Sequence, residues 1–245
     1  MKTYFISDLH LCETRRGITT SFLELLANLD PKETDALYIL GDLFEFWVGD
    51  DYNTPFNLQI KNALKDAVDR GTDIYLVKGN RDFLVGKRFA KQTGVTLLGD
   101  ETVIDLYGVP TLILHGDTLC TDDVKYQEFR QKVNQPWLQW VFNHLPLSLR
   151  LKIVSKVKGQ ARNDKQDKQL DIMDVNQHAV VDAFNRQQVT HMIHGHTHRP
   201  DLHTVELTNQ IGERRVLGDW HSHNFVLRVT ASDHSVIKEP IVEPK

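Results

Sequence analysis

Seven residues of types that bind divalent metal ions follow five short apolar segments of this 245-residue chain. The segments are 3–7, 36–40, 74–77, 111–114 and 191–193, and apolar runs of this length are typical of buried strands. In α/β folds the ends of strands deliver side chains to one edge of a sheet, where sites form. We therefore expect the seven side chains to converge in one cluster. Its members are Asp8, His10, Asp42, Asn80, His115, His196 and His198.

The number and types of these residues suit two metal ions. A divalent ion takes about four to six ligands, and one carboxylate can serve two ions because it has two oxygens. Mixed imidazole and oxygen ligands favour Mn²⁺, Fe²⁺ or Zn²⁺ over Ca²⁺. Each fragment alone is an ordinary strand end or turn, so the prediction depends on all five occurring in this order.

The order of the fragments resembles the signature of the calcineurin-like metallophosphoesterases. That family carries DxH, GD, GNH(D/E), a single His after a strand, and GHxH, and this chain carries DLH, GD, GNRD, HGD and GHTH. The resemblance covers residues 1 to about 120 and about 190 to 225. It implies an α/β fold whose core is a two-sheet β-sandwich flanked by helices.

The resemblance also implies how the ligands divide between two metal sites. Asp8, His10 and His198 would bind one ion, Asn80, His115 and His196 the other, and Asp42 would bridge them. The residues with implied catalytic roles are Asp42, Arg81 and His196.

The chain departs from that signature at Arg81, where the family usually has a histidine. Arginine stays protonated near neutral pH, so it can only stabilise charge, in a forked geometry that suits phosphate oxygens. No proton is needed when the leaving group is itself a phosphate, whose second pKa is about 6. Arg81 therefore favours cleavage of a pyrophosphate bond over an alkyl monoester. A salt bridge in a loop is the alternative.

Longer segments resemble one branch of the family, the members that hydrolyse UDP-2,3-diacylglucosamine in the lipid A biosynthesis of Gram-negative bacteria. They are SDLHL, GDLFEFWVGDD, KGNRDFL, HGDTLCTDD, IMDVN and IHGHTHRP. This resemblance implies a pyrophosphohydrolase that uses two Mn²⁺ ions and releases 2,3-diacylglucosamine 1-phosphate (lipid X) and UMP. It implies substrate contacts at Asn80, Arg81, Asp123, Lys165, Lys168 and His196. Two of the family's contact positions, a Ser and an Asn, fall on Ala161 and Lys165. Lys165 would replace the amide with a charge, and no contact is assigned to Ala161.

At about residues 122–188 a helical pattern replaces the alternation of strands and loops, which predicts a lid inserted into a single domain of residues 1–245. Trp140 and Phe142 precede a stretch, residues 145–170, with seven Lys or Arg and two Asp. A basic helix with much aliphatic surface is typical of an interfacial element or of a lid over an anionic lipid. We expect Trp140 and Phe142 to contact acyl chains. A helical hairpin with a solvated basic face is the alternative.

Charge and composition limit the partners and the location. The net charge of −4 argues against nucleic-acid binding, and the two cysteines, Cys12 and Cys120, predict free thiols. The strand at the N-terminus leaves no room for a signal peptide, and no apolar run reaches the ~18–20 residues of a spanning helix. We expect a cytoplasmic monomer, peripherally associated with the cytoplasmic face of the inner membrane. Its partners would be this membrane and a UDP-linked diacylated glucosamine.

Two other interpretations stay open. Another dinuclear-metal phosphodiesterase, or a nucleotide pyrophosphatase, would keep the metal ligands without needing the apolar and basic insertion. A non-catalytic scaffold is disfavoured, although one fold hosts many functions, because the chain retains all seven candidate ligands.

Overall fold

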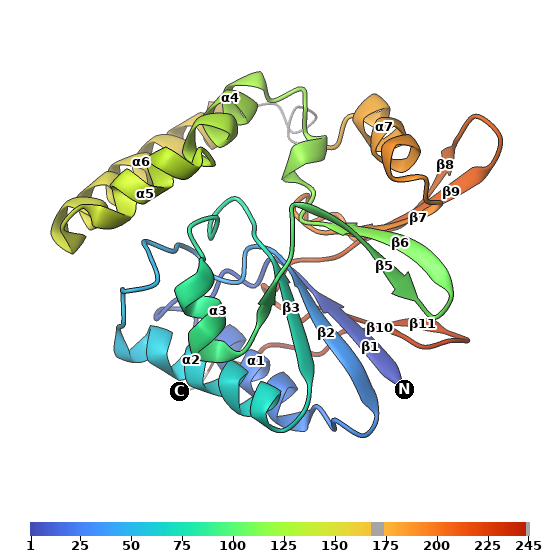
Figure 1. Cartoon of the computed structure of the whole chain (residues 1–245), viewed down its shortest axis with the longest axis horizontal. Coiled ribbons are helices and arrows are strands. Elements are labelled where there is room, and N and C mark those ends of the chain that lie inside the picture. The colour runs from blue at the N-terminus through green and yellow to red at the C-terminus, as the bar shows by residue number, and fades with distance from the viewer. Residues whose placement is uncertain (168–173, 244–245) are drawn as a thin grey trace.

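The computed structural model describes residues 1–167 and 174–243, with the backbone alone for residue 158 and residues 160–167. In that part of the chain the strands form two sheets that pack face to face, with helices on the outer faces (Figure 1). The expected α/β fold with a two-sheet core flanked by helices is confirmed.

The first sheet, within the described residues, has six strands. In spatial order they are β11 (His234–Ile237), β10 (Val226–Val229), β1 (Lys2–Ile6), β2 (Thr34–Leu40), β3 (Asp73–Val77) and β4 (Thr96–Leu97). Strands β1 to β4 run parallel, whereas β10 pairs antiparallel with β1 and β11 pairs antiparallel with β10.

The second sheet has five strands in the part of the chain described. In spatial order they are β5 (Glu101–Leu106), β6 (Val109–Leu114), β7 (His191–His194), β9 (Ile211–Val216) and β8 (Leu202–Glu206). Strands β6, β7 and β9 are parallel, and the edge strands β5 and β8 are antiparallel to their neighbours. The five predicted strands that precede candidate ligands are therefore β1, β2 and β3 in one sheet and β6 and β7 in the other.

Helices cover both sheets (Figure 1). They are α1 (Arg16–Asn28), α2 (Pro55–Asp69) and α3 (Lys87–Thr93) on the first sheet and α7 (Gln177–Gln187) on the second. Helix α2 begins at Pro55, because Thr54 accepts a hydrogen bond from the Asn57 amide at 3.1 Å and Pro55 is preorganised for the first helical position.

Two hydrophobic clusters hold these layers together. The larger joins the two sheets and α1–α3, and it includes Phe22 of α1, Ile39 of β2 and Leu64 of α2. The smaller lies between the second sheet and α7 and includes Met192 and Phe184. Burial of both faces of β2 and β7 explains why their sequences are continuous apolar runs rather than alternating ones.

Three helices extend away from the sandwich (Figure 1) and are called the lid below. They are α4 (Val124–Val133), α5 (Pro136–His144) and α6 (Leu147–Asp167), and they follow a single 3₁₀ turn, η1 (Asp117–Leu119). Helix α7, which also falls in the predicted insertion, instead packs on the second sheet through Val180, Ala183 and Phe184. None of the helices that the structure describes has the length and apolarity needed to cross a bilayer.

A buried arginine of α6 attaches the lid to the loop that follows β2. Arg150, only 2% exposed, donates from Nη1 to the Val48 carbonyl and to Asp51 Oδ1, both at 2.8 Å. Its Nη2 also pairs with Asp51, and its Nε donates to the Leu145 carbonyl at 3.1 Å. A guanidinium that binds both oxygens of a carboxylate is a strong and directional contact, so this pair holds α6 beside the loop.

Gly49→Ala is expected to weaken this attachment. Gly49 has a φ of +128°, and a Cβ there would lie 2.3 Å from Arg150 Nη1. We expect limited proteolysis within α5 and α6 to become roughly tenfold faster, because cleavage follows the population of the open form. Gly108→Ala is the matched control, since Gly108 also has a positive φ, +89°, but no atom lies within 4 Å of its added Cβ. Equal effects of the two substitutions on lid cleavage would contradict the attachment.

Candidate metal centre

The strand ends of both sheets meet at one site. Asp8 and His10 follow β1, Asp42 follows β2, Asn80 follows β3, His115 follows β6, and His196 and His198 follow β7. The loops are joined across the sheets by backbone hydrogen bonds, among them Asp8 N to Gly41 O at 3.1 Å and Gly195 N to His115 O at 2.8 Å. The structure thus brings together all seven residues that the sequence singled out.

Asp8, His10 and His198 form the first group of potential ligands. Their ligand atoms all lie within 4.8 Å of one another, and His198 Nε2 is 3.3 Å from Asp8 Oδ1. Both ring nitrogens of His10 are buried without a hydrogen-bond partner in the described structure. Buried polar atoms normally have partners, so two orphaned imidazole nitrogens beside a carboxylate fit a metal ion as the missing partner.

Asn80, His115 and His196 form the second group. Asn80 Oδ1 is 3.0 Å from His115 Nε2 and 3.1 Å from His196 Nδ1, and the two ring nitrogens are 3.2 Å apart. His115 Nδ1 lies 2.8 Å from the Leu40 carbonyl, to which it can only donate, so Nε2 is the nitrogen that faces the group and would bind an ion once it has lost its proton. Lone-pair atoms gathered this closely fit a cation.

Asp42 lies between the two groups. Its Oδ2 is 3.7 Å from His10 Nδ1 in the first group, and its Oδ1 is 3.7 Å from His115 Nε2 in the second. The two oxygens of one carboxylate therefore face different groups, which is the arrangement of a bridging ligand. Gly79 makes this possible, because a Cβ at that position would lie 2.2 Å from Asp42 Oδ1.

Neutral imidazoles bind metal ions, and the pKa values of two of the four candidate histidines, His10 and His196, favour the neutral form. Burial, together with the charge of Arg81, lowers the pKa of His10 to about 3, and burial together with His115 lowers the pKa of His196 to about 4. Burial acts to lower the pKa of His115 as well, but Asp42 and Asp8 outweigh it and raise that pKa to about 9. The buried carboxylates thus retain a proton on His115 that a metal ion would replace.

Five of the seven residues have left-handed backbone conformations. Their φ values are +57° at Asp8, +51° at His10, +53° at Asp42, +69° at His196 and +56° at His198. Each such conformation costs an L-residue other than glycine about 1–3 kcal/mol and persists only where the surrounding structure imposes it. Strain of this kind collects at functional sites.

Other buried or half-buried acids support the candidate ligands, and the sequence reasoning gave them no role. Asp82 accepts hydrogen bonds from the amides of Gly79 and Leu43, both at 2.8 Å, and so ties the loop after β3 to the loop after β2. Asp219 Oδ2 lies 3.5 Å from His198 Nδ1 and orients that ring. His221, which also follows β9, lies 3.0 Å from Arg15 Nη2 and not among the candidate ligands.

Arg81 lies at the rim of the centre. Its backbone amide donates to Asp42 Oδ1 at 2.9 Å, while its side-chain Nε is 3.5 Å from Asp42 Oδ2. Its Nη1 is 3.1 Å from Glu45 Oε1, and the side chain remains 29% exposed. The guanidinium is therefore held beside the candidate ligands with room for an anion to approach from outside.

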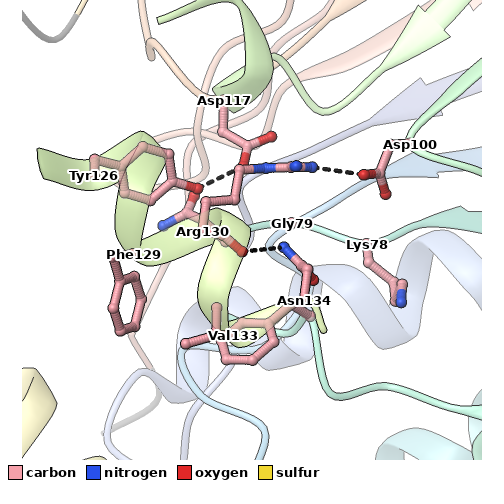
Figure 2. A pocket seen from close by; sticks show the side chains of 11 residues that line it. Lys78, Gly79, Asp100, Asp117, Tyr126, Phe129, Arg130, Val133 and Asn134 are labelled. Atoms are coloured by element: carbon pink, nitrogen blue, oxygen red, sulfur yellow. Dashed lines mark hydrogen bonds and ion pairs between the residues drawn. The ribbon is translucent and has the colours of Figure 1, made fainter. Parts of the chain in front are cut away.

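A pocket lies beside Asn80 under helix α4 (Figure 2). Asp117 at its wall receives hydrogen bonds from Tyr126 and, at 2.7 Å, from Arg130 Nε, and Arg130 Nη2 also binds Asp100 at 2.7 Å. Asp123, a predicted substrate contact, caps α4 by accepting from the Tyr126 amide at 3.1 Å. The predicted contacts Lys165 and Lys168 lie outside the residues whose side chains are described.

The family model described as Calcineurin-like phosphoesterase matches residues 1–200 of this chain. That match spans most of the sequence and includes every candidate ligand. The chain therefore belongs to the calcineurin-like phosphoesterase family, and the candidate two-metal site stands where its five motifs meet.

Curated relatives narrow the resemblance further. The UDP-2,3-diacylglucosamine hydrolase of Vibrio atlanticus (strain LGP32) is 54% identical over 230 residues, 94% of each chain. The hydrolase of the same name from Actinobacillus succinogenes is 52% identical, and the match covers 95% of this chain and 97% of the relative. That from Escherichia coli O7:K1 (strain IAI39 / ExPEC) is 50% identical, and the match covers 98% of this chain and 100% of the relative. The branch that the longer sequence segments indicated is confirmed.

Among solved structures, an archaeal phosphodiesterase aligns with 98% of this chain and 99% of its own chain, at 12% sequence identity and a TM-score of 0.48.

Proposed function

We propose that this enzyme hydrolyses the pyrophosphate bond of UDP-2,3-diacylglucosamine to 2,3-diacylglucosamine 1-phosphate and UMP in lipid A biosynthesis. The observation that carries the proposal is the two-group ligand cluster joined by Asp42, beside a pocket under the lid. Near-full-length identity of 50–54% with hydrolases named for this substrate supports the same reaction.

The ions of this site are proposed to be two Mn²⁺. Asp8, His10 and His198 would hold one and Asn80, His115 and His196 the other, with Asp42 shared. When bound, such a pair lowers the pKa of a water and offsets phosphate charge. The carboxylate and amide oxygens of Asp8, Asp42 and Asn80 are donors that suit Mn²⁺.

The protein side chains supply binding and orientation. Arg81 would bind a phosphate oxygen with its forked guanidinium, and Glu45 at 3.1 Å fixes the direction of that fork. Because Arg81 is permanently charged, it stabilises the developing phosphate charge without transferring a proton. His196 and Asn80 would present ring and amide atoms to the same phosphate, while Asp123, Lys165 and Lys168 are the proposed contacts to the sugar part of the substrate.

The reaction is tested with the chelator-treated protein and two substrates. We expect UMP release from UDP-2,3-diacylglucosamine to be absent without metal and restored by added Mn²⁺. UDP-N-acetylglucosamine, which lacks the acyl chains, should be hydrolysed at least roughly 100-fold more slowly, because each buried methylene contributes about 0.8 kcal/mol. Equal hydrolysis of the two substrates would instead favour a general nucleotide pyrophosphatase.

The lid is proposed to contact the cytoplasmic face of the inner membrane, with the protein as a peripherally bound monomer. Trp137 and Trp140 on α5 are 66% and 63% exposed, and Lys152 and Lys156 on α6 are exposed as well. Exposed tryptophans beside lysines are typical of helices that lie in a lipid interface. Phe142, by contrast, packs against the larger hydrophobic cluster, so the structure separates two residues that the sequence had grouped as acyl contacts.

Replacing Trp137 and Trp140 with Ser should weaken binding to anionic liposomes by roughly tenfold or more, because burying one large apolar side chain contributes about 1.5–3 kcal/mol. Hydrolysis of a water-soluble short-chain analogue should stay unchanged. Lys152→Gln with Lys156→Gln should weaken liposome binding mainly at low salt. Phe142→Ser is the contrasting variant. Because Phe142 packs against the larger hydrophobic cluster, this change should reduce activity on both the diacylated substrate and the short-chain analogue. If the tryptophan variant binds liposomes like the parent protein, this surface is not the membrane contact.

A further inference from the structure

A histidine and an arginine lie buried together on the face of the second sheet that is covered by α7. His194 ends β7 and is fully buried, and Arg214 on β9 is 4% exposed. Arg214 is in register with Met192, which shares a face of β7 with His194 and belongs to the smaller hydrophobic cluster. The pair is therefore separated by the sheet from the larger core, and neither residue belongs to the seven candidate ligands.

Arg214 carries a buried charge: burial lowers its pKa and outweighs Asp174 and Asp201, which act on it through space and favour the charged form. No acidic group among the described residues forms an ion pair with its guanidinium, and its Nε is buried without a hydrogen-bond partner. The hydrogen bond it makes is from Nη1 to His194 Nε2 at 3.0 Å. A buried charge without an ion-pair partner among the described residues is unfavourable for folding, so its presence is explained better by another role than by stability.

The contact with Arg214 determines which nitrogen of His194 carries the proton. A guanidinium can only donate, so His194 Nε2 must accept and the ring proton must be on Nδ1. Nδ1 lies 2.8 Å from the carbonyl oxygen of Gly195, which can only accept. Arg214 thus makes His194 a donor to the first peptide of the segment that carries His196 and His198.

That peptide is the anchor of a strained turn. The Gly195 carbonyl also accepts a hydrogen bond from the Thr197 amide at 2.8 Å, which closes a three-residue γ-turn around His196. The φ of His196 is +69°, and γ-turns with a positive central φ are rare and strained. The amide of His196 in turn donates to Asp8 Oδ2 at 2.9 Å, so the turn connects the buried pair directly to the candidate metal ligands.

We propose that Arg214 is a positioning residue of the metal centre, which acts through the Nδ1–H of His194 to hold the strained turn that presents His196 and His198. This inference rests on the proposed function, because it assigns a role relative to the ions of that site. The unpaired charge is retained because it fixes one tautomer of His194, and outer contacts of this kind set ligand orientation and metal affinity.

Arg214→Met tests the inference by two measurements, Mn²⁺ affinity and unfolding temperature, for which a positioning residue and a structural residue give opposite results. Titration of Mn²⁺ into the chelator-treated protein, followed by calorimetry, should show affinity reduced about 10–100-fold. The metal-free variant should unfold at the same temperature as the parent or higher, because methionine fills the site without a buried charge. A purely structural arginine would lower the unfolding temperature and leave the affinity of the folded protein unchanged, which would overturn the proposal.

Two further variants complete the design. Arg215→Met changes the next arginine of β9, which lies 3.7 Å from Glu213, and should leave Mn²⁺ affinity within about twofold of the parent. His194→Asn keeps an amide donor near the position of Nδ1, so Arg214→Met should have little additional effect in that background. Equal losses of Mn²⁺ affinity from Arg214→Met in the parent and in the His194→Asn background would contradict the proposed route.

The same titrations distinguish failure of this inference from failure of the proposed function. If the parent protein binds Mn²⁺ and Arg214→Met binds it equally well, the positioning role fails while the proposed function stands. If the parent protein binds no Mn²⁺, the proposed function itself fails.

Discussion

The Asp42→Ala variant should lose hydrolysis of UDP-2,3-diacylglucosamine, with kcat/KM at least roughly 10³-fold below the parent. Asp42 is the residue whose two oxygens face different ligand groups, each at 3.7 Å. Without it, each group keeps three donors, and the two ions lose the anion that screens their mutual repulsion. We therefore also expect less than two Mn²⁺ per chain, measured by elemental analysis after dialysis.

The control for this prediction is Asp66→Ala, which removes an exposed carboxylate of α2. Asp42→Asn serves as a second variant, because asparagine tolerates the left-handed backbone at this position, φ +53°, better than alanine does. Circular dichroism establishes that both variants are folded. Full turnover with two bound ions in either Asp42 variant would contradict the bridging assignment.

The Arg81→Ala variant should keep both metal ions but lose roughly 10²–10³-fold in kcat, as expected when one preorganised charge donor is removed. The backbone amide of Arg81, not its side chain, makes the 2.9 Å hydrogen bond to Asp42, so the substitution leaves that contact in place. The combination of unchanged metal content and reduced kcat distinguishes this residue from Asp42. Steady-state kinetics and elemental analysis on the same preparations provide the measurement.

Arg81→His adds a check on the leaving-group argument. A histidine at this position should recover little activity on the pyrophosphate substrate, yet it should improve cleavage of a p-nitrophenyl phosphate ester relative to Arg81→Ala. Lys87→Ala removes an exposed cation of α3 and should have no effect. Parent-like kcat in Arg81→Ala would show that the departure from the family's histidine has no catalytic meaning.

The candidate ligands could be predicted from sequence because each follows directly on its strand. The link between strand end and ligand is local, so an apolar run such as β2 and the Asp42 after it are visible together. Asp82 and Asp219 could not be assigned, since their roles depend on contacts with loops that are distant in sequence. Asp82, for example, binds the Leu43 amide 39 residues away.

The insertion shows the same limit on a larger scale. Its composition predicted helices, but Arg150 was counted among the seven basic residues of the stretch 145–170 and is instead buried against Asp51, 99 residues away. Likewise α7 has an ordinary amphipathic pattern that fits either a lid or a core helix, and only the position of the second sheet decides for the core. Sequence gives the faces of such helices but not the surface against which each face packs.

The left-handed backbone at five candidate ligands has a consequence for engineering this chain. Glycine adopts a positive φ without a steric penalty, so glycine substitutions there would relax the local conformation of the metal-free chain. The same substitutions would remove candidate ligands, because each of the five positions holds an aspartate or a histidine. Engineering this chain for stability at these positions would therefore dismantle the candidate metal centre.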